Sequence, residues 1–154
     1  MAKMTIVTMP GDGIGRTVLP EALRVIEAAG FEAKYVHGDI GWEFWKNEGN
    51  ALPDRTIALL QKHRLGLFGA ITSKPKDKAA AEISPKLKDK GFVYYSPIVG
   101  MRQHFNLDVC IRPCRSFAGN PLNFIRRKGG GFEEPNVDVV IFRQNTEGLY
   151  AGVE

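Results

Sequence analysis

The amino-acid sequence predicts an α/β fold with an open, mostly parallel sheet and flanking helices. Three observations lead to this prediction. Short runs rich in β-branched residues alternate with stretches of helical periodicity, a glycine-dense turn joins the first strand to the first helix, and an almost wholly apolar run follows. The 154 residues suffice for one domain with a hydrophobic core, or for part of a larger protein.

The first part of the chain supplies these elements in order. Residues 5–9 are β-branched and stop at Pro10, which indicates a strand. Gly11-Asp12-Gly13-Ile14-Gly15, here called the glycine segment, then precedes apolar residues at helical spacing up to Gly30. The further elements expected are a strand at 31–36, a helix beginning near Pro53, and an apolar strand at 65–71 buried on both faces.

The second part of the chain is less regular. Six lysines fall between residues 74 and 90, where we expect a solvated loop and helix. This stretch has no interleaved aromatic or arginine residues, so no nucleic-acid partner is expected. Residues 117–135 are polar and rich in glycine and proline, which predicts a long surface connection, and residues 137–142 predict a strand.

Composition excludes several classes of protein. A net charge of +4, 44% apolar and 25% charged residues are ordinary for a soluble globular domain. No run approaches 18 consecutive apolar residues, so no membrane span is expected, and the start lacks a secretory signal, so a cytoplasmic location is expected. The two cysteines, Cys110 and Cys114, exclude a disulfide scaffold and a four-cysteine zinc site.

Three arginines beside apolar residues are the strongest candidates for binding. Arg102, Arg112 and Arg143 would each be costly to bury without an anion. If they converge, their guanidinium groups suit a di- or tricarboxylate, because each can bind a carboxylate through two hydrogen bonds. Internal salt bridges to Asp or Glu are the alternative, and spacing alone does not exclude them.

The other candidates each have two interpretations. The glycine segment has the spacing G-x-G-x-G rather than G-x-G-x-x-G, so it is either a tight strand-to-helix turn or a close approach to a nucleotide. Ser96 and Thr72 are either caps or residues at a ligand-binding sheet edge. Tyr150 is either a proton donor or an aromatic residue at a domain edge.

Several motifs in a fixed order resemble the decarboxylating β-hydroxyacid dehydrogenases, the isocitrate/isopropylmalate dehydrogenase family. The first strand with the glycine segment is similar to the N-terminal signature of the family. Ser96-x₅-Arg102-Gln103 and Ile111-Arg112-Pro113 are similar to its substrate-binding segment. Residues 142–150, which contain Arg143-Gln144-Asn145-Thr146-Glu147-Gly148, resemble the run typical of the isocitrate branch.

The resemblance implies a reaction and a role for each matching residue. The reaction is oxidative decarboxylation of isocitrate with NAD or NADP and with Mg²⁺ or Mn²⁺, which polarises a carbonyl as a Lewis acid. The expected substrate-binding residues are Ser96, Arg102, Arg112 and Arg143. Tyr150 is the expected acid that protonates the enol after CO₂ leaves, and Thr72 and Ile14 are expected to contact the cofactor.

The resemblance also implies an incomplete enzyme. Family members are more than twice this length, and their metal ligands and catalytic lysine lie further along. We therefore expect an N-terminal fragment, with residues 1–107 as the first part of the large domain and 108–154 as the start of the small domain. The isolated chain is expected to be inactive, and the full-length protein is expected to be a homodimer.

Two departures from the family pattern leave alternatives open. Ile98 and Asp108 stand where isocitrate members commonly have asparagine and tyrosine. A related isopropylmalate or homoisocitrate dehydrogenase, or a non-catalytic regulatory subunit, is the alternative function.

Overall fold

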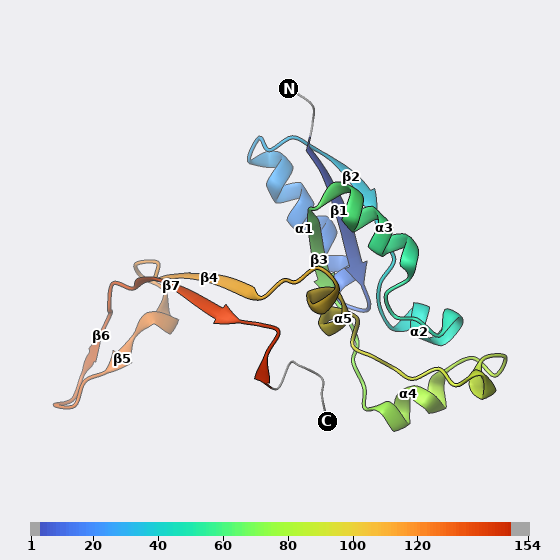
Figure 1. Cartoon of the computed structure of the whole chain (residues 1–154). Helices are drawn as coiled ribbons and strands as arrows, with labels where there is room; N and C mark the ends of the chain where they lie inside the picture. Colours follow the sequence, from blue (N-terminus) through green and yellow to red (C-terminus); the bar gives the residue numbers. More distant parts are fainter. Residues whose placement is uncertain (1–3, 149–154) are drawn as a thin grey trace. The chain divides into compact units, whose positions relative to one another are not determined.

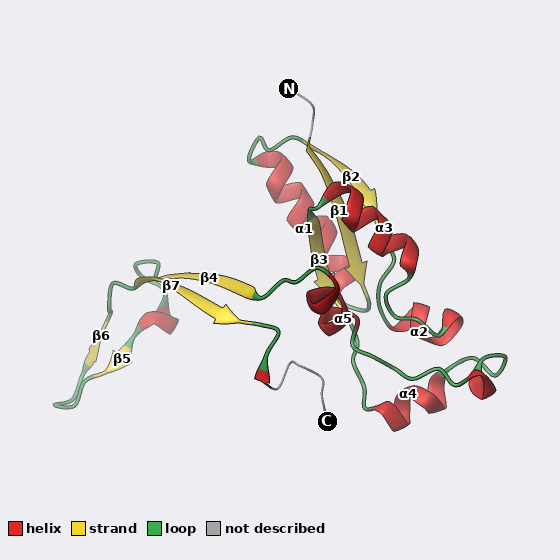
Figure 2. Cartoon of the chain, in the orientation of Figure 1, coloured by secondary structure: helices red, strands yellow, loops and turns green. Residues whose placement is uncertain are grey.

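The computed structural model describes residues 4–148, and the chain divides into two compact units between Met101 and Arg102. Figures 1 and 2 show its helices and strands. In the described range no helix has both the length and the apolar character needed to cross a membrane. The predicted division of the domains after residue 107 stays a prediction. The elements are β1 (Met4–Gly11), α1 (Gly15–Ala28), β2 (Ala33–His37), α2 (Trp42–Glu48), α3 (Asp54–His63), β3 (Gly66–Ala70), α4 (Lys76–Glu82), η1 (Lys88–Lys90), α5 (Pro97–His104), β4 (Val109–Arg115), η2 (Pro121–Asn123), β5 (Ile125–Arg126), β6 (Phe132–Glu133) and β7 (Asp138–Gln144).

A parallel sheet organises the first unit and confirms the predicted α/β class. β1 lies in the middle of the order β2-β1-β3, and both neighbours run parallel to it, with Val7 opposite Val36 and Gly66. Parallel neighbours need a crossover, which α1 supplies between β1 and β2. In Figure 1, α1 and α3 lie on opposite faces of this sheet. Val7 and Met9 of β1 share one face of the sheet, the face near Thr56 and Leu60 of α3, and are fully buried there.

The sequence placed these strands and helices close to their observed bounds, with one error in burial. Gly30 ends the first helix as expected, with φ of +81° and its amide bonded to the Glu27 carbonyl at 2.9 Å. β3 was expected to be buried on both faces, and this was wrong. Residues 67–70 are only half-buried, because β3 has a hydrogen-bonded neighbour on one side only within the described sheet.

Two glycines of the glycine segment allow β1, β3 and the start of α1 to touch. A Cβ on Gly11 would lie 1.9 Å from the Ala70 carbonyl oxygen. A Cβ on Gly15 would lie 2.1 Å from the Pro10 oxygen and 2.5 Å from the Ala70 nitrogen. These obstacles are backbone atoms that cannot turn away. A tight, close-packed turn therefore explains glycine at both positions.

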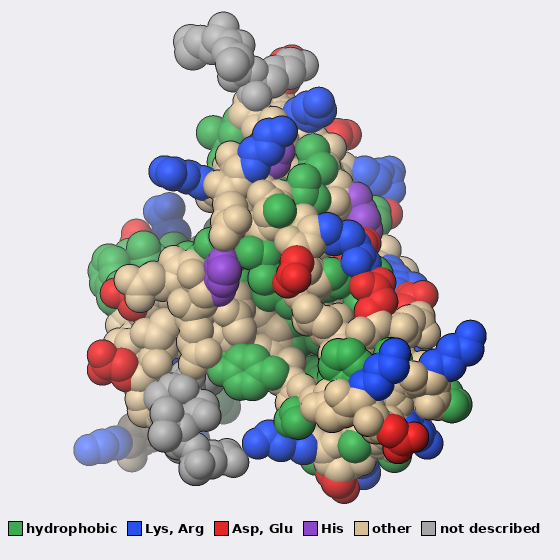
Figure 3. Space-filling model, turned by 45° about the vertical axis from the view of Figure 1, so that its right-hand side comes forward, with side chains coloured by type: hydrophobic (Ala, Val, Ile, Leu, Met, Phe, Trp, Pro, Cys, Tyr) green, Lys and Arg blue, Asp and Glu red, His purple; other side chains and the backbone are tan. Residues whose placement is uncertain are grey.

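The lysine-rich segment is anchored by an apolar cluster on α2. Trp42, Trp45, Ala51, Ala79, Ile83 and Tyr94 form this cluster, here called the tryptophan cluster. The Trp45 indole donates to the Ala79 carbonyl at 2.9 Å, which fixes α4 against α2. Lys76, Lys78 and the later lysines are exposed, as expected for a solvated segment. On the face drawn in Figure 3, basic side chains are interspersed with acidic and apolar ones.

The second unit is built from two antiparallel strand pairs. β4 pairs with β7 over seven residue pairs from Val109–Gln144 to Arg115–Asp138, and this pair is called the ribbon below. β5 pairs with β6. Residues 117–135 were expected to be a long surface connection. They are largely exposed, as expected, and they contain η2 and the β5–β6 pair.

Gly15→Ala is expected to destabilise the first unit because the added Cβ meets only backbone. We expect a loss of roughly 2–3 kcal/mol in the free energy of unfolding, typical of overpacking. Gly129→Ala is the matched control, since a Cβ at Gly129 meets nothing within 4 Å. Urea unfolding followed by circular dichroism measures both, and equal midpoints for the two variants would contradict the packing described.

Trp45→Ala is expected to lower the free energy of unfolding by about 3–5 kcal/mol, since a large buried ring is removed. Trp45 is 1% exposed, and its loss also leaves the Ala79 carbonyl without its donor. Phe117→Ala is the control, because Phe117 is 71% exposed. The free energy of unfolding of this control is expected to stay within about 0.5 kcal/mol of wild type. A Trp45→Ala change of similarly small size would show that α4 is not anchored by this ring.

Candidate functional site

The carboxyl ends of β1 and β3 meet at a buried carboxylate. Asp12 is 9% exposed, and its amide donates to the Ala70 carbonyl at 2.7 Å. Its Oδ2 accepts the amide of Trp42 at 2.6 Å and the amide of Thr72 at 3.0 Å. One carboxylate thus ties the glycine segment to the start of α2 and to the chain that leaves β3. Ligands of open α/β sheets bind at this edge.

The start of the first helix is arranged as a closed turn. The amides of Gly15 and Arg16 donate to the carbonyls of Asp12 and Gly13, at 3.0 and 3.1 Å. These amides are therefore already satisfied inside the turn. Together with the close packing at Gly11 and Gly15, this favours the structural interpretation for both of these glycines. Gly13 differs, because it has a φ of +50° and open space where a Cβ would be.

Ile14 and Thr72, the predicted cofactor contacts, lie at this edge. Ile14 precedes the first helical residue of α1 and is 68% exposed, so it presents an apolar surface to solvent. Thr72 is half-buried, and its amide is used by Asp12. Ile14 thus follows Asp12 by two residues, and Thr72 is a direct hydrogen-bond partner of the Asp12 carboxylate.

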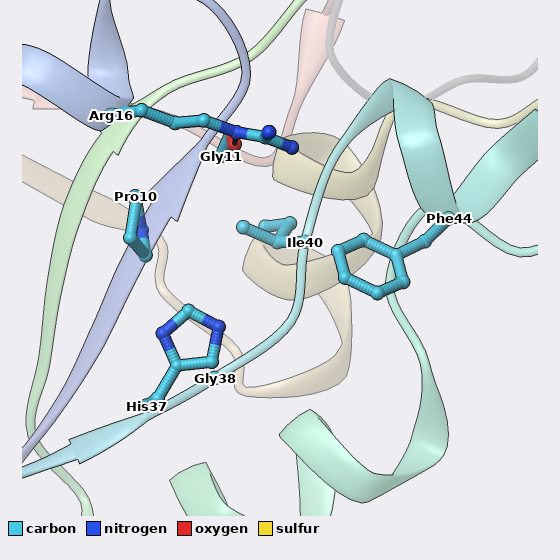
Figure 4. Close-up of a pocket in the computed structure, with 7 residues that line it drawn as sticks. All are labelled: Pro10, Gly11, Arg16, His37, Gly38, Ile40 and Phe44. Carbon is cyan, nitrogen blue, oxygen red and sulfur yellow. Dashed lines mark hydrogen bonds between the residues drawn. The ribbon is translucent and has the colours of Figure 1, made fainter.

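A shallow pocket lies beside the glycine segment, between β1, β2 and α2. Its volume is about 200 Å³. Figure 4 shows the Arg16 guanidinium and the His37 imidazole on opposite sides, with Ile40 and Phe44 between α2 and the strands. Arg16 is paired with Glu43 and also donates to the Gly11 carbonyl at 3.1 Å. The hydrogen bond that Arg16 donates to Glu43 raises the pKa of Arg16, and the same contact joins α2 to the turn.

A second carboxylate, Glu82, links α4 to the tryptophan cluster. It accepts from the Trp42 indole at 2.7 Å and pairs with Lys74 at 2.5 Å. Lys74 and the Trp42 donor hold the pKa of Glu82 below its usual value. Tyr94 is 6% exposed and packs edge-on against Trp42 at 5.0 Å. Burial raises the pKa of Tyr94, and the nearby charge of Asp12 adds to this shift.

The ribbon places two of the predicted substrate arginines on one face. Cys110 lies opposite Arg143, and Arg112 lies opposite Ile141. Directly opposite residues share a face, and residues two apart on a strand share it too, so Arg112 and Arg143 are diagonal neighbours. Such neighbours have backbones about 7–8 Å apart, within reach of one ligand for two arginine side chains.

The other face of the ribbon is exposed and, apart from Arg115, Asp138 and Gln144 at its ends, apolar. It carries Val109, Ile111, Val140 and Phe142, which are between 51% and 69% exposed. At one end of the ribbon, the Asn145 amide donates to the Asp108 carbonyl at 2.8 Å, and Asn145 is 5% exposed. The alternation of the strands thus places Arg112 and Arg143 on one side of the ribbon and these four apolar side chains on the other.

The remaining predicted residues lie in different places. Ser96 directly precedes α5 in the first unit, and its carbonyl accepts the Gly100 amide at 2.9 Å. Arg102 lies in the last turn of α5 and belongs to the second unit with Arg112 and Arg143. Tyr150 lies outside the described residues. Convergence of Ser96 with the arginines and Tyr150 stays a prediction.

The described residues contain no group of three or more His, Cys, Asp or Glu side chains that could hold a metal ion. Cys110 and Cys114 are free thiols on the arginine face of the ribbon. Asp12 is the residue that the sequence interpretation passed over. The available signal was an acidic residue between two glycines at the end of a strand, where only a specific hydrogen-bonding role favours an acid.

This chain is similar to known proteins over nearly its whole length. Residues 5–154 match the family model described as isocitrate/isopropylmalate dehydrogenase. Protein DlpA of Legionella pneumophila is 40% identical over 151 residues, which cover 97% of this chain and 22% of that protein. The homoisocitrate dehydrogenase of Methanocaldococcus jannaschii is 36% identical, over 98% of this chain and 40% of that protein.

Solved structures agree with this match. The isocitrate dehydrogenase of Methylococcus capsulatus superimposes with a TM-score of 0.74 at 31% identity, over 97% of this chain and 37% of that one. The chain thus spans less than half the length of these relatives. The glycine segment, Ser96 and the three arginines all lie within the matched residues. The chain belongs to the isocitrate/isopropylmalate dehydrogenase family.

Proposed function

We propose that this chain is the N-terminal part of an enzyme that oxidatively decarboxylates isocitrate to 2-oxoglutarate with NAD or NADP and with Mg²⁺ or Mn²⁺. The observation that carries the proposal is the pair of arginines on one face of the ribbon. Their strand register supports a site for a substrate with more than one carboxylate. The family membership supports the class of reaction.

Arg112 and Arg143 are suited to hold two carboxylates of one substrate. Each guanidinium has a planar fork of donors that matches the two oxygens of a carboxylate. Arg112 is exposed and Arg143 is half-buried, so a ligand can reach this face of the ribbon from solvent. We assign Arg102, at the end of α5, to a third carboxylate or to the charge that develops during the reaction.

The edge of the parallel sheet fits one side of a dinucleotide site. The exposed Ile14 offers an apolar surface for a planar ring, and the open position at Gly13 lets a ligand come close to the backbone. When bound, NAD(P)⁺ supplies the hydride acceptor, and Mg²⁺ or Mn²⁺ supplies Lewis acidity. We assign no metal ligand to the described residues.

Ser96 and Tyr150 complete the proposed set. The Ser96 hydroxyl would donate a hydrogen bond to the carboxylate that distinguishes isocitrate from related acids. Tyr150 would donate the proton to the carbon that loses CO₂, which needs a phenol positioned as a general acid. We also propose a cytoplasmic homodimer for the full-length protein and no turnover by the isolated 154-residue chain.

Homoisocitrate is the second candidate substrate. Ile98 stands in α5 where isocitrate members commonly have asparagine, which removes one polar contact and favours a longer or less polar substrate. The relative from Methanocaldococcus jannaschii is named a homoisocitrate dehydrogenase. Isopropylmalate and a non-catalytic regulatory role are the remaining alternatives.

Arg112→Gln in the full-length protein is expected to lower kcat/KM for isocitrate by about 10- to 150-fold. This corresponds to the loss of a hydrogen bond between charged groups, worth about 1.5–3 kcal/mol. Arg115→Gln is the matched control, because Arg115 lies on the same strand but on the other face, paired at 3.7 Å with Asp138. In steady-state kinetics, the kcat/KM of that variant for isocitrate should stay within about twofold of wild type. Equal losses in both variants would contradict the assignment of the arginine face.

Tyr150→Phe is expected to lower kcat by about 100-fold or more, with a smaller change in KM for isocitrate, because a general acid acts in the transition state. Tyr35→Phe is the control, since the Tyr35 hydroxyl has no hydrogen-bond partner in the described part of the chain. Spectrophotometric measurement of NAD(P)H formation compares them. A normal kcat for Tyr150→Phe would exclude the phenol as the acid.

A further inference from the structure

We infer that Asp12 is a positioning residue of the cofactor subsite: its carboxylate fixes the main chain at Thr72 relative to the glycine segment. This inference rests on the proposed function, because it takes the edge formed by Ile14 and Thr72 as part of the dinucleotide site. Asp12 itself is too buried to face a ligand, and both of its acceptor contacts are to backbone amides. It therefore acts through the segments that it holds.

The geometry makes Asp12 the common anchor of three segments that are far apart in sequence. Its Oδ2 accepts amides 30 and 60 residues away, at 2.6 and 3.0 Å. Its own amide donates to the Ala70 carbonyl at 2.7 Å, so the residue is fixed to β3 from both its backbone and its side chain. A neutral side chain of the same shape would offer one carbonyl oxygen without the charge that strengthens both hydrogen bonds.

The surroundings of Asp12 are shaped around the carboxylate. A Cβ at Gly41 would lie 2.5 Å from its Oδ2, and Gly41 has a φ of +121°, so only glycine suits that position. Gly41 directly precedes α2, whose first residue donates the 2.6 Å hydrogen bond. The backbone before α2 thus leaves just enough room for an acid at Asp12. This fit points to a defined geometry at the end of β3 rather than to a loop that adapts freely.

The same carboxylate connects the edge of the sheet with the tryptophan cluster. The Trp42 main-chain amide donates to Asp12, and the Trp42 indole donates to Glu82. Tyr94 packs against both tryptophans, at ring-centroid distances of 5.0 and 5.4 Å. Trp42 and Trp45 are the two tryptophans of these 154 residues, and both belong to the cluster that Asp12 is tied to through Trp42.

Asp12→Asn in the full-length protein is the test, with the exposed Asp77→Asn in the first turn of α4 as the matched control. A weaker acceptor should let the backbone at Thr72 shift, and we expect KM for NAD(P)⁺ to rise about tenfold. We expect kcat to stay within about threefold, because the substrate arginines and Tyr150 are unchanged. A merely structural role would instead lower thermal stability and the amount of active enzyme and leave KM for the cofactor unchanged, which would overturn the inference.

Equilibrium binding separates this inference from the proposed function. Isothermal titration of NAD⁺ and NADP⁺ into wild type, Asp12→Asn and Asp77→Asn needs no turnover. If wild type binds a dinucleotide but does not turn over isocitrate, the proposed substrate is wrong, and an approximately tenfold weaker Kd for Asp12→Asn alone still supports the inference. Equal Kd values for all three proteins, or no dinucleotide binding by folded wild type, would overturn it. A far-UV circular dichroism spectrum of Asp12→Asn close to that of wild type would show that the variant is folded.

Discussion

The first unit depends on one buried carboxylate that accepts two backbone amides. Without the hydrogen bonds from Trp42 and Thr72, the start of α2 and the exit of β3 would have no common partner at the end of β1. The close packing at Gly11 and Gly15 and the missing side chain at Gly41 all serve this junction, because they bring the three backbones within reach of Asp12. The edge where ligands of such sheets bind is therefore held by polar contacts rather than by apolar packing.

In the second unit, strand alternation determines which side chains share a face. Because side chains of a strand point alternately to opposite faces, the β4–β7 register sorts Arg112 and Arg143 to one side and Ile111 and Phe142 to the other. A shift of one strand by one residue would turn its side chains to the opposite face and so separate Arg112 from Arg143. The ion pair of Arg115 with Asp138 and the bond from Asn145 to Asp108 lie at the two ends of the ribbon, where they support this register.

Local signals were enough to predict the parallel α/β class, the helix that ends at Gly30 and the strand at residues 137–142. Long-range contacts were not predictable in the same way. The partners of Asp12 are 30 and 60 residues away, and nothing local marks Trp42 or Thr72 as its donors. In the lysine-rich segment only Ala79 and Ile83 are buried, too few for an apolar pattern to show that α4 packs on α2. The half-buried state of β3 also depended on its place in the sheet, which composition does not reveal.

The arginines show what a sequence motif can predict and what it cannot. Residue type and neighbours singled out Arg112 and Arg143, whereas their shared face follows only from the pairing of strands that are far apart in sequence.

The measurement that tests the account most directly is a coupled assay of the full-length protein. It follows NADH and NADPH formation with Mg²⁺ and, in parallel, isocitrate, homoisocitrate and 3-isopropylmalate. The account predicts turnover with isocitrate as the preferred acid and with one of the two cofactors. A folded protein that turns over none of the three acids would contradict it and favour a non-catalytic subunit.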